Sequence, residues 1–422
     1  MSDMILNNCH IVNHDTELKN RTIYIDKDRI SAIKEKPDPD GLDMKGMTVL
    51  PGLIDMHVHL REPGEEHKED ILSGSRAAAK GGFTGICLMP NTKPPADTPQ
   101  AISFLMKRAN ETDIVDIYPF GALTKKLESN EITEIYDMIK AGARGFSDDG
   151  EGTSSSKILF NAAKYCLRDD ILITTHCEDK AFTEGGQIND SRIALETGLK
   201  GIPHIDEDII VYRNLSIASY LGSRMHIAHV SSSHSLDIIE NFKNRGDNVT
   251  CEVTPHHLLF NDGVYKNFDT NYKVKPPLRT ENDRKALISA LKNGIIDIIA
   301  TDHAPHQIYE KEVEFEAAPF GILGLETALV SLYTYLIKDN TLSFRDIARS
   351  MAYNPSRILG IEEHYIKEGA YADITVFNTD ANTSIDRDFI SSKSFNTPFK
   401  DKTLDGRIEL TIRKGRIVYE AE

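Results

Sequence analysis

The chain has 422 residues, a length that suits one large barrel with an appendage or two to three smaller domains. Forty per cent of the residues are hydrophobic and 27% are charged, as in ordinary globular proteins. Lysine and arginine total 49 against 65 aspartates and glutamates, so the formal net charge is −16. This balance argues against nucleic acid or an anionic membrane as the main partner, because both attract basic surfaces. It leaves an anionic small molecule open, since such a ligand responds to the local field.

Two features predict a cytoplasmic protein. The first residues, MSDMILNNCHIVNHD, lack the basic start and apolar core of a signal peptide, and no apolar run approaches the roughly 20 residues of a membrane helix. The five cysteines are scattered and form no CxxC pair, which predicts reduced thiols. Cys177 follows His176 and could be a ligand or a nucleophile, but free cysteines are usually small buried residues, and we favour burial.

The first 50 residues alternate polar and apolar side chains in MILNNCHIVN and RTIYIDKDRISAIKE, which predicts short, half-buried strands. From about residue 51, short apolar runs alternate with helical patterns of about 12 to 18 residues. The expected strands are, in chain order, GLIDMHVHL, TGICLMPN, DIYPFGAL, ARGFSDDG, DILITTHCED, RMHIAHVSS, NVTCEVTP and DIIATDHAP. Eight strands that alternate with helices predict an α/β fold, a (β/α)₈ TIM-like barrel. A doubly wound open sheet is the alternative, but no GxGxxG motif opens a helix.

The end of the chain returns to strand patterns, in YADITVFNTD and in GRIELTIRKGRIVYE, where RKG predicts a hairpin turn. Neither end of the chain is long enough to close a core alone. We therefore predict one small β-sandwich domain formed by both termini, residues 1–50 and 365–422, beside a barrel of residues 51–364. The alternative is that each end caps the barrel separately.

Polar side chains stand where the barrel strands end, which is where barrel enzymes carry their chemistry. These residues are His57, His59, Asn91, Asp149, His176, His229, His256 and Asp302. Because side chains alternate along a strand, Asp55, His57 and His59 share one face, which we expect to line the barrel interior. Two imidazoles one pleat apart can bind a single metal ion.

Each of these residues also has a structural explanation. A single interior histidine is more often a hydrogen-bonded core residue than a ligand, Asp148 and Asp149 before a glycine could form a turn, and Asp302 could cap a helix. Four histidines and two aspartates at the same end of five strands nevertheless match the imidazole and carboxylate ligands of zinc. We therefore predict a metal centre.

Eight motifs together resemble the amidohydrolase superfamily and, within it, the class I dihydroorotases: DMHVHLREPG, MPNT, GFSDDG, THCED, HVSS, TPHHL, PPLR and ATDHAPH. The similarity runs from about residue 5 to the closing TIRKGRIVYE. HxH with a late aspartate marks only the superfamily, and HLREPG is shared with allantoinases. MPNT together with DHAPH and an aspartate in the fourth strand indicates the dihydroorotases.

The resemblance implies one or two zinc ions per subunit. It assigns His57, His59 and Asp302 to one metal, His176 and His229 to a second, and Asp149 to a bridge between them, with Asp302 as the catalytic residue. The implied substrate contacts are His59, Arg61, Asn91, Lys275, His306 and the backbone of Phe320 and Gly321. Lys275 departs from the family, which usually has asparagine before PPLR, and a lysine can donate a hydrogen bond but cannot accept one.

The implied reaction is the reversible cyclisation of N-carbamoyl-L-aspartate to L-dihydroorotate in de novo pyrimidine (UMP) biosynthesis. A homodimer and an association with aspartate transcarbamoylase stay open. The first alternative is another cyclic amidohydrolase, a dihydropyrimidinase, hydantoinase or allantoinase, but those families usually carry a carboxylated lysine where Asp149 stands. The second is a non-catalytic homologue that scaffolds a transcarbamoylase. Missing ligands would mark such a scaffold, and the sequence keeps them all.

Overall fold

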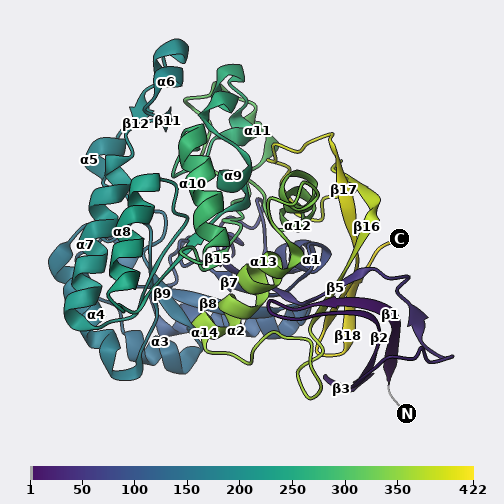
Figure 1. The fold of residues 1–422 in the computed structure, drawn as a ribbon. Helices are drawn as coiled ribbons and strands as arrows, with labels where there is room; N and C mark the ends of the chain where they lie inside the picture. Colours follow the sequence, from purple (N-terminus) through teal and green to yellow (C-terminus); the bar gives the residue numbers. More distant parts are fainter. Residues whose placement is uncertain (1–2) are drawn as a thin grey trace.

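The computed structural model describes residues 3–422, and within them a barrel lies beside a curved sheet (Figure 1). Eight parallel strands form the barrel sheet, in spatial order β6 (Leu53–Val58), β7 (Phe83–Leu88), β8 (Asp116–Ala122), β9 (Gly145–Ser147), β10 (Ile173–Thr175), β13 (Met225–Ile227), β14 (Val249–Val253) and β15 (Ile298–Ile299). A bridge between Val58 and His303 joins the last strand to the first. Each apolar run predicted as a strand overlaps one of these strands, so the predicted barrel is confirmed.

Helices lie between the strands and cover the outside of the barrel (Figure 1). The longer ones are α1 (Ile71–Lys80), α2 (Pro99–Thr112), α3 (Ile135–Ala141), α4 (Ser156–Cys166), α7 (Ile205–Leu221), α8 (Ser233–Asn244) and α10 (Glu281–Lys292). Short ones are α5 (Lys180–Thr183), α6 (Arg192–Thr197), α9 (Pro255–Leu259), α11 (Ile308–Lys311), α12 (Ala328–Leu332), α13 (Phe344–Ala348) and α14 (Asn354–Leu359). None of the helices in residues 3–422 combines the length and apolar composition that a bilayer span requires.

Side-chain caps fix where several of these helices begin. The carboxylate of Asp70 accepts a hydrogen bond from the backbone N–H of Ser73, and the hydroxyl of Thr280 accepts one from Asp283. In both cases the third residue returns a side-chain bond to the cap, which satisfies backbone groups that a helix start leaves unpaired. Residues next to each helix start therefore fix where these helices begin.

The second sheet combines both ends of the chain. Its order is β18 (Arg416–Glu420), β17 (Thr403–Arg413), β16 (Ile374–Ser384), β5 (Thr48–Pro51), β1 (Met4–Val12), β2 (Glu17–Asp26) and β3 (Arg29–Lys34), with the short β4 (Leu42–Asp43) on β1. The two ends meet where β5 pairs with β16, with Val49 opposite Val376. Buried residues from six of these strands pack into one cluster, so the sheet bends around a core of its own. The predicted β-sandwich from both termini is confirmed.

The terminal sheet is joined to the barrel by hydrogen bonds as well as by packing. Thr375 on β16 donates to the backbone carbonyl of Gly82, between α1 and β7, and Thr411 on β17 donates to that of Ala79 near the end of α1. The predicted division at residues 50/51 and 364/365 stays a prediction.

Candidate active site

The residues predicted to form the site converge at the carboxyl ends of the barrel strands. His57 lies on β6, and the other metal-ligand candidates follow their strands within three residues: His59, Asp149, His176, His229 and Asp302. All six side chains are buried or nearly so. A pocket of about 390 Å³ opens above them, and every predicted site residue except the fully buried His57 lines it.

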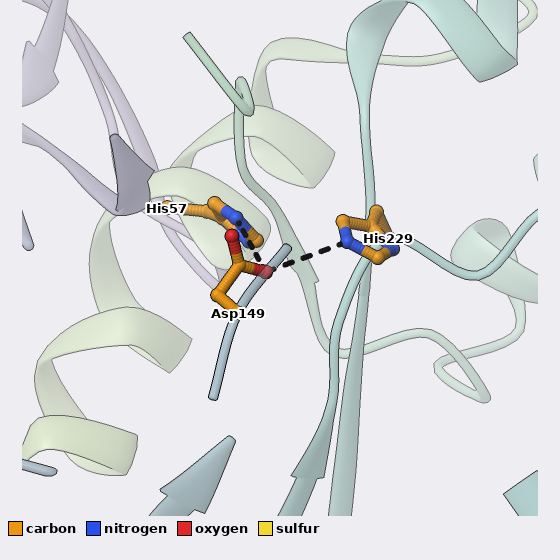
Figure 2. Close-up of side chains that lie close together, drawn as sticks. All are labelled: His57, Asp149 and His229. Carbon is orange, nitrogen blue, oxygen red and sulfur yellow. Dashed lines mark ion pairs between the residues drawn. The ribbon is translucent and has the colours of Figure 1, made fainter. Parts of the chain in front are cut away.

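The first metal-ligand group consists of His57, Asp149 and His229, whose side chains point toward one another (Figure 2). Oδ1 of Asp149 lies 3.3 Å from Nε2 of His57 and 3.7 Å from Nε2 of His229. Both Oδ1 of Asp149 and Nε2 of His57 are buried without a hydrogen-bond partner among residues 3–422. Because an unsatisfied buried polar atom is costly, these two atoms fit a ligand that both contact.

A second group shares His57 and adds His59 and Asp302. Oδ1 of Asp302 lies 3.0 Å from Nε2 of His59 and 3.6 Å from Nε2 of His57. Within each group, the candidate ligand atoms lie within 4.8 Å of one another. Imidazole nitrogens and carboxylate oxygens are ligands that zinc accepts, so the donor set fits a metal centre.

His176 joins the centre from the side of His229. Its Nδ1 lies 3.0 Å from Nε2 of His229 and 3.8 Å from Oδ1 of Asp149. Asp149 therefore lies between the pair His57 and His59 and the pair His176 and His229, as a bridging ligand would. The neighbouring Asp148 is occupied elsewhere, because its two oxygens accept hydrogen bonds from Thr124 and Thr153. This arrangement supports the choice of Asp149.

Two buried carboxylates behind the histidines were missed by sequence reasoning. Glu252 on β14 accepts from Nδ1 of His57 at 2.6 Å and from Nε2 of His226 at 3.1 Å. Glu178 lies 2.9 Å from Nε2 of His176. Such partners orient a ligating imidazole and raise its basicity. The available signal was an acidic residue inside an otherwise apolar strand, in NVTCEVTP.

Burial and neighbouring charged side chains set the protonation states of the site residues. Burial raises the pKa of the Asp149 carboxyl, but His57, His229 and His59 lower it more, so it lies well below its usual range. For Asp302, burial is likewise outweighed by His59 and His57, and its pKa falls to about 2. Burial and the nearby Arg61 lower the pKa of His306 to about 2. Both carboxylates are therefore ionised at neutral pH, and His306 is neutral.

Arg61 stands in the pocket wall without a counter-ion, because no carboxylate among the described residues pairs with it within 4 Å. Its Nε donates to the carbonyl of Pro305 at 3.4 Å, and Nη2 lies 3.5 Å from Nε2 of His306. Asn91 faces the same pocket, and its Oδ1 accepts from Nδ1 of His59 at 2.8 Å. The free guanidinium and the Nδ2 group of Asn91 suit an anionic ligand.

The loop that carries Phe320 and Gly321 is held from several sides. The N–H of Gly321 donates to the carbonyl of Lys273 at 2.8 Å, and Nε2 of His306 donates to the carbonyl of Phe320 at 2.9 Å. Gly321 has φ +141°, and a Cβ there would lie 2.8 Å from both Cβ and the carbonyl oxygen of Ala304. Only glycine fits this position, so the loop lies close against the pocket.

Three site residues have the left-handed backbone that favours glycine. The φ angles are +58° for Arg61, +32° for His229 and +49° for Asp302. Strain of this kind persists where the surrounding structure over-determines a residue, and it clusters at functional sites. The thiol of Cys177, in contrast, is buried, and burial raises its pKa to about 12, so the expected burial is confirmed and the thiol is not poised as a nucleophile.

Comparisons with known proteins agree with this geometry. The dihydro-orotase-like family matches residues 46–235, and the amidohydrolase family matches residues 252–419. A dihydroorotase of Syntrophus aciditrophicus is 44% identical over 97% of this chain and 95% of its own length. One of Caldanaerobacter subterraneus is 44% identical over 90% of this chain and 88% of its own. The chain belongs to the dihydroorotase family.

Comparison with solved structures places this chain, a member of the dihydroorotase family, among the cyclic amidohydrolases. The L-hydantoinase (dihydropyrimidinase) of Arthrobacter aurescens superposes with a TM-score of 0.88 at 26% identity, over all of this chain and 96% of that one. A dihydropyrimidinase of Brevibacillus agri superposes with a TM-score of 0.85 at 21% identity, over 99% of this chain and 95% of that one, and shows the fold alone.

Proposed function

We propose that this protein catalyses the reversible cyclisation of N-carbamoyl-L-aspartate to L-dihydroorotate in pyrimidine biosynthesis. The observation that carries the proposal is the guanidinium of Arg61, which has no carboxylate partner among residues 3–422 and lies in the same pocket as the histidine and aspartate cluster. A cationic group held near a hydrolytic centre suits a cyclic amide that bears a carboxylate. The membership in the dihydroorotase family supports the same reaction.

The proposal includes two zinc ions. His57, His59 and Asp302 would hold one, His176 and His229 the other, and Asp149 would contact both. Bound zinc would supply an activated water near neutral pH and polarise the carbonyl under attack. The protein contributes the orientation of the ligands, through Glu252 behind His57 and Glu178 behind His176.

Asp302 is the proposed proton carrier. With a pKa of about 2 its carboxylate is ionised at neutral pH, so it can accept a proton from the attacking water. It then donates this proton to the ring nitrogen as the C–N bond breaks. In the direction of ring closure the same carboxylate takes the proton from the carbamoyl nitrogen and passes it to the departing oxygen, which leaves as water once a further proton from the solvent is added.

The remaining pocket residues would fix the substrate. Arg61 would bind the substrate carboxylate bidentately, while Asn91 donates from Nδ2, because its Oδ1 is occupied by His59. His306 and the backbone of Phe320 and Gly321, which line the same pocket, would also contact the substrate. Holding the carboxylate away from the reacting carbon places the ring for attack. His59 and Lys275 also line this space, and the proposal retains them as substrate contacts.

A cytoplasmic location forms part of the proposal and is supported by five buried cysteines without disulfides. A homodimer and an association with aspartate transcarbamoylase are compatible with it. The alternative function is another cyclic amidohydrolase, which the hydantoinase structures favour. Asp149 and Arg61 favour dihydroorotate over it, because hydantoin and dihydrouracil carry no carboxylate for Arg61.

The test is a spectrophotometric assay of dihydroorotate disappearance beside dihydrouracil, hydantoin and allantoin, with the zinc-loaded protein. We expect turnover of dihydroorotate and little of the other three, and a rise in KM for dihydroorotate in Arg61→Met. Faster turnover of hydantoin or dihydrouracil would contradict the proposal and support the alternative.

A further inference from the structure

Lys275 contacts a buried carboxylate that in turn contacts the candidate metal centre. Its Nζ lies 2.6 Å from Oε1 of Glu178, and Thr183 donates its hydroxyl to the same oxygen. The other oxygen of Glu178, Oε2, lies 2.9 Å from Nε2 of His176. One carboxylate therefore joins an ammonium at the pocket wall to an imidazole of the centre.

The two ring nitrogens of His176 face different partners. Nδ1 faces the centre, 3.0 Å from Nε2 of His229, whereas Nε2 faces Glu178. The proton of a neutral imidazole then lies on Nε2 and is donated to Glu178, which leaves the Nδ1 lone pair for a metal. A full negative charge on the accepting carboxylate makes such an imidazole a stronger ligand.

Lys275 opposes this effect. The side chain of Glu178 is only 3% exposed and that of Lys275 28%, so water screens the pair weakly. The ammonium also lies 5.6 Å from the ring centroid of Phe320, which steadies it from the side of the pocket loop. A positive charge at 2.6 Å draws electron density from the carboxylate and weakens its attraction for the imidazole proton.

We propose that Lys275 is a positioning residue that lowers the affinity of the second metal position by offsetting the charge of Glu178 behind His176. The inference rests on the proposed role of His176 as a ligand. It leaves the predicted substrate contact open, because a lysine ammonium has three N–H donors and Glu178 uses one.

The experiment compares zinc affinities of metal-stripped proteins without substrate, by competition with a chromophoric chelator that resolves the weaker of two sites. Lys275→Met removes the charge and keeps the chain length, and we expect it to tighten the weaker site about three- to tenfold. Glu178→Gln should loosen the same site by about 10-fold or more. The double variant should match Glu178→Gln, because Lys275 acts only through that carboxylate.

Two further variants isolate the charge. Lys275→Arg keeps it and should retain the parent affinity. Lys180→Met is the matched control, since Lys180 pairs with Glu151 at the same end of the barrel but contacts no candidate ligand, and its affinity should equal that of the parent. Circular dichroism on each variant checks that the fold is intact.

Unchanged or weaker zinc binding in Lys275→Met would overturn the inference, and so would an equal tightening in the Glu178→Gln background. Loosening in both single variants would indicate that the pair only braces the loop. These titrations involve no turnover, so a failure of the dihydroorotate assay leaves them interpretable, and a zinc result against the inference leaves the proposed reaction standing.

Discussion

The candidate site and the terminal sheet are built on opposite principles. The terminal sheet buries a cluster of apolar side chains, such as Ile25, Val49 and Ile412, and its two halves meet where β5 and β16 pair without a register shift. The candidate site buries histidines and carboxylates, and Nε2 of His57 and Oδ1 of Asp149 have no hydrogen-bond partner in the described part of the chain. It also holds Asp302 in a strained conformation. One region supplies stability, while the other tolerates unfavourable local arrangements that suit chemistry. Changes in the two regions should therefore have separable effects.

The largest effect is expected at Asp302. Asp302→Asn keeps the shape and an oxygen ligand but cannot carry a proton, so kcat for dihydroorotate should fall by about 10²–10⁴-fold. Zinc content, measured by atomic absorption, and the urea midpoint should stay close to those of the parent. A variant that binds zinc normally and keeps near-parent kcat would remove Asp302 from the proton-transfer role.

The next prediction concerns the terminal sheet, where a substitution should lower stability and leave catalysis unchanged. Ile412 on β17 is fully buried in the core of the terminal sheet, and Ile412→Ala leaves a cavity there. The free energy of unfolding in urea should fall by about 2–5 kcal/mol. Below the unfolding transition, kcat and KM for dihydroorotate should not change. A loss of kcat with unchanged stability would show that the two regions are coupled.

A smaller effect is expected from Lys311, a buried lysine whose Nζ donates to the carbonyl of Pro319 beside the pocket. Burial and the nearby Lys273 lower its pKa to about 7. Between about pH 7 and the unfolded pKa of about 10.4, the unfolded chain binds more protons than the folded one at this group. Lys311 should therefore make stability rise with pH in this window, by at most about 1.4 kcal/mol per pH unit.

The measurement is the free energy of unfolding at several pH values from 6.5 to 10, in the parent and in Lys311→Met. The free energy of unfolding should rise less steeply with pH in the variant than in the parent. The two slopes should become equal below about pH 7, where Lys311 is protonated in both states. Parallel profiles would mean that Lys311 titrates near its ordinary pKa. Matching profiles in the comparison variant Lys367→Met, which alters an exposed lysine, would confirm the baseline.

The last prediction is that bicarbonate has no effect on the recovery of activity after the metal is removed and restored. The carboxyl of Asp149 is ionised without CO₂, because its pKa lies well below the usual range, whereas a carboxylated lysine would need CO₂ to form. Metal-stripped protein should regain activity with Zn²⁺ alone in CO₂-free buffer, and added bicarbonate should change neither the rate nor the extent. Recovery that depends on bicarbonate would assign the bridge to a lysine.

The sequence by itself predicted much of this protein. Alternation of polar and apolar residues at both ends predicted the shared terminal sheet, and apolar runs between helical patterns predicted the barrel. Both could be predicted because backbone periodicity is a local property. The position of polar residues after the apolar runs gave the site, since parallel strands deliver their carboxyl ends to one face. The ligand candidates from His57 to Asp302 followed from that rule together with the resemblance.

Only the tertiary structure decided what stands behind and around those residues. Glu252 meets His57 across 195 positions of the chain, and Glu178 is joined to Lys275, which lies in the segment between α9 and α10. The closure through Val58 and His303, and the hydrogen bond from the N–H of Gly321 to the carbonyl of Lys273, likewise join residues that lie far apart in the sequence. No local pattern encodes such pairs, because which carboxylate lies against which imidazole depends on strand stagger and loop packing. These contacts set the charge and orientation of each candidate ligand, and so the chemistry that the proposed site can perform.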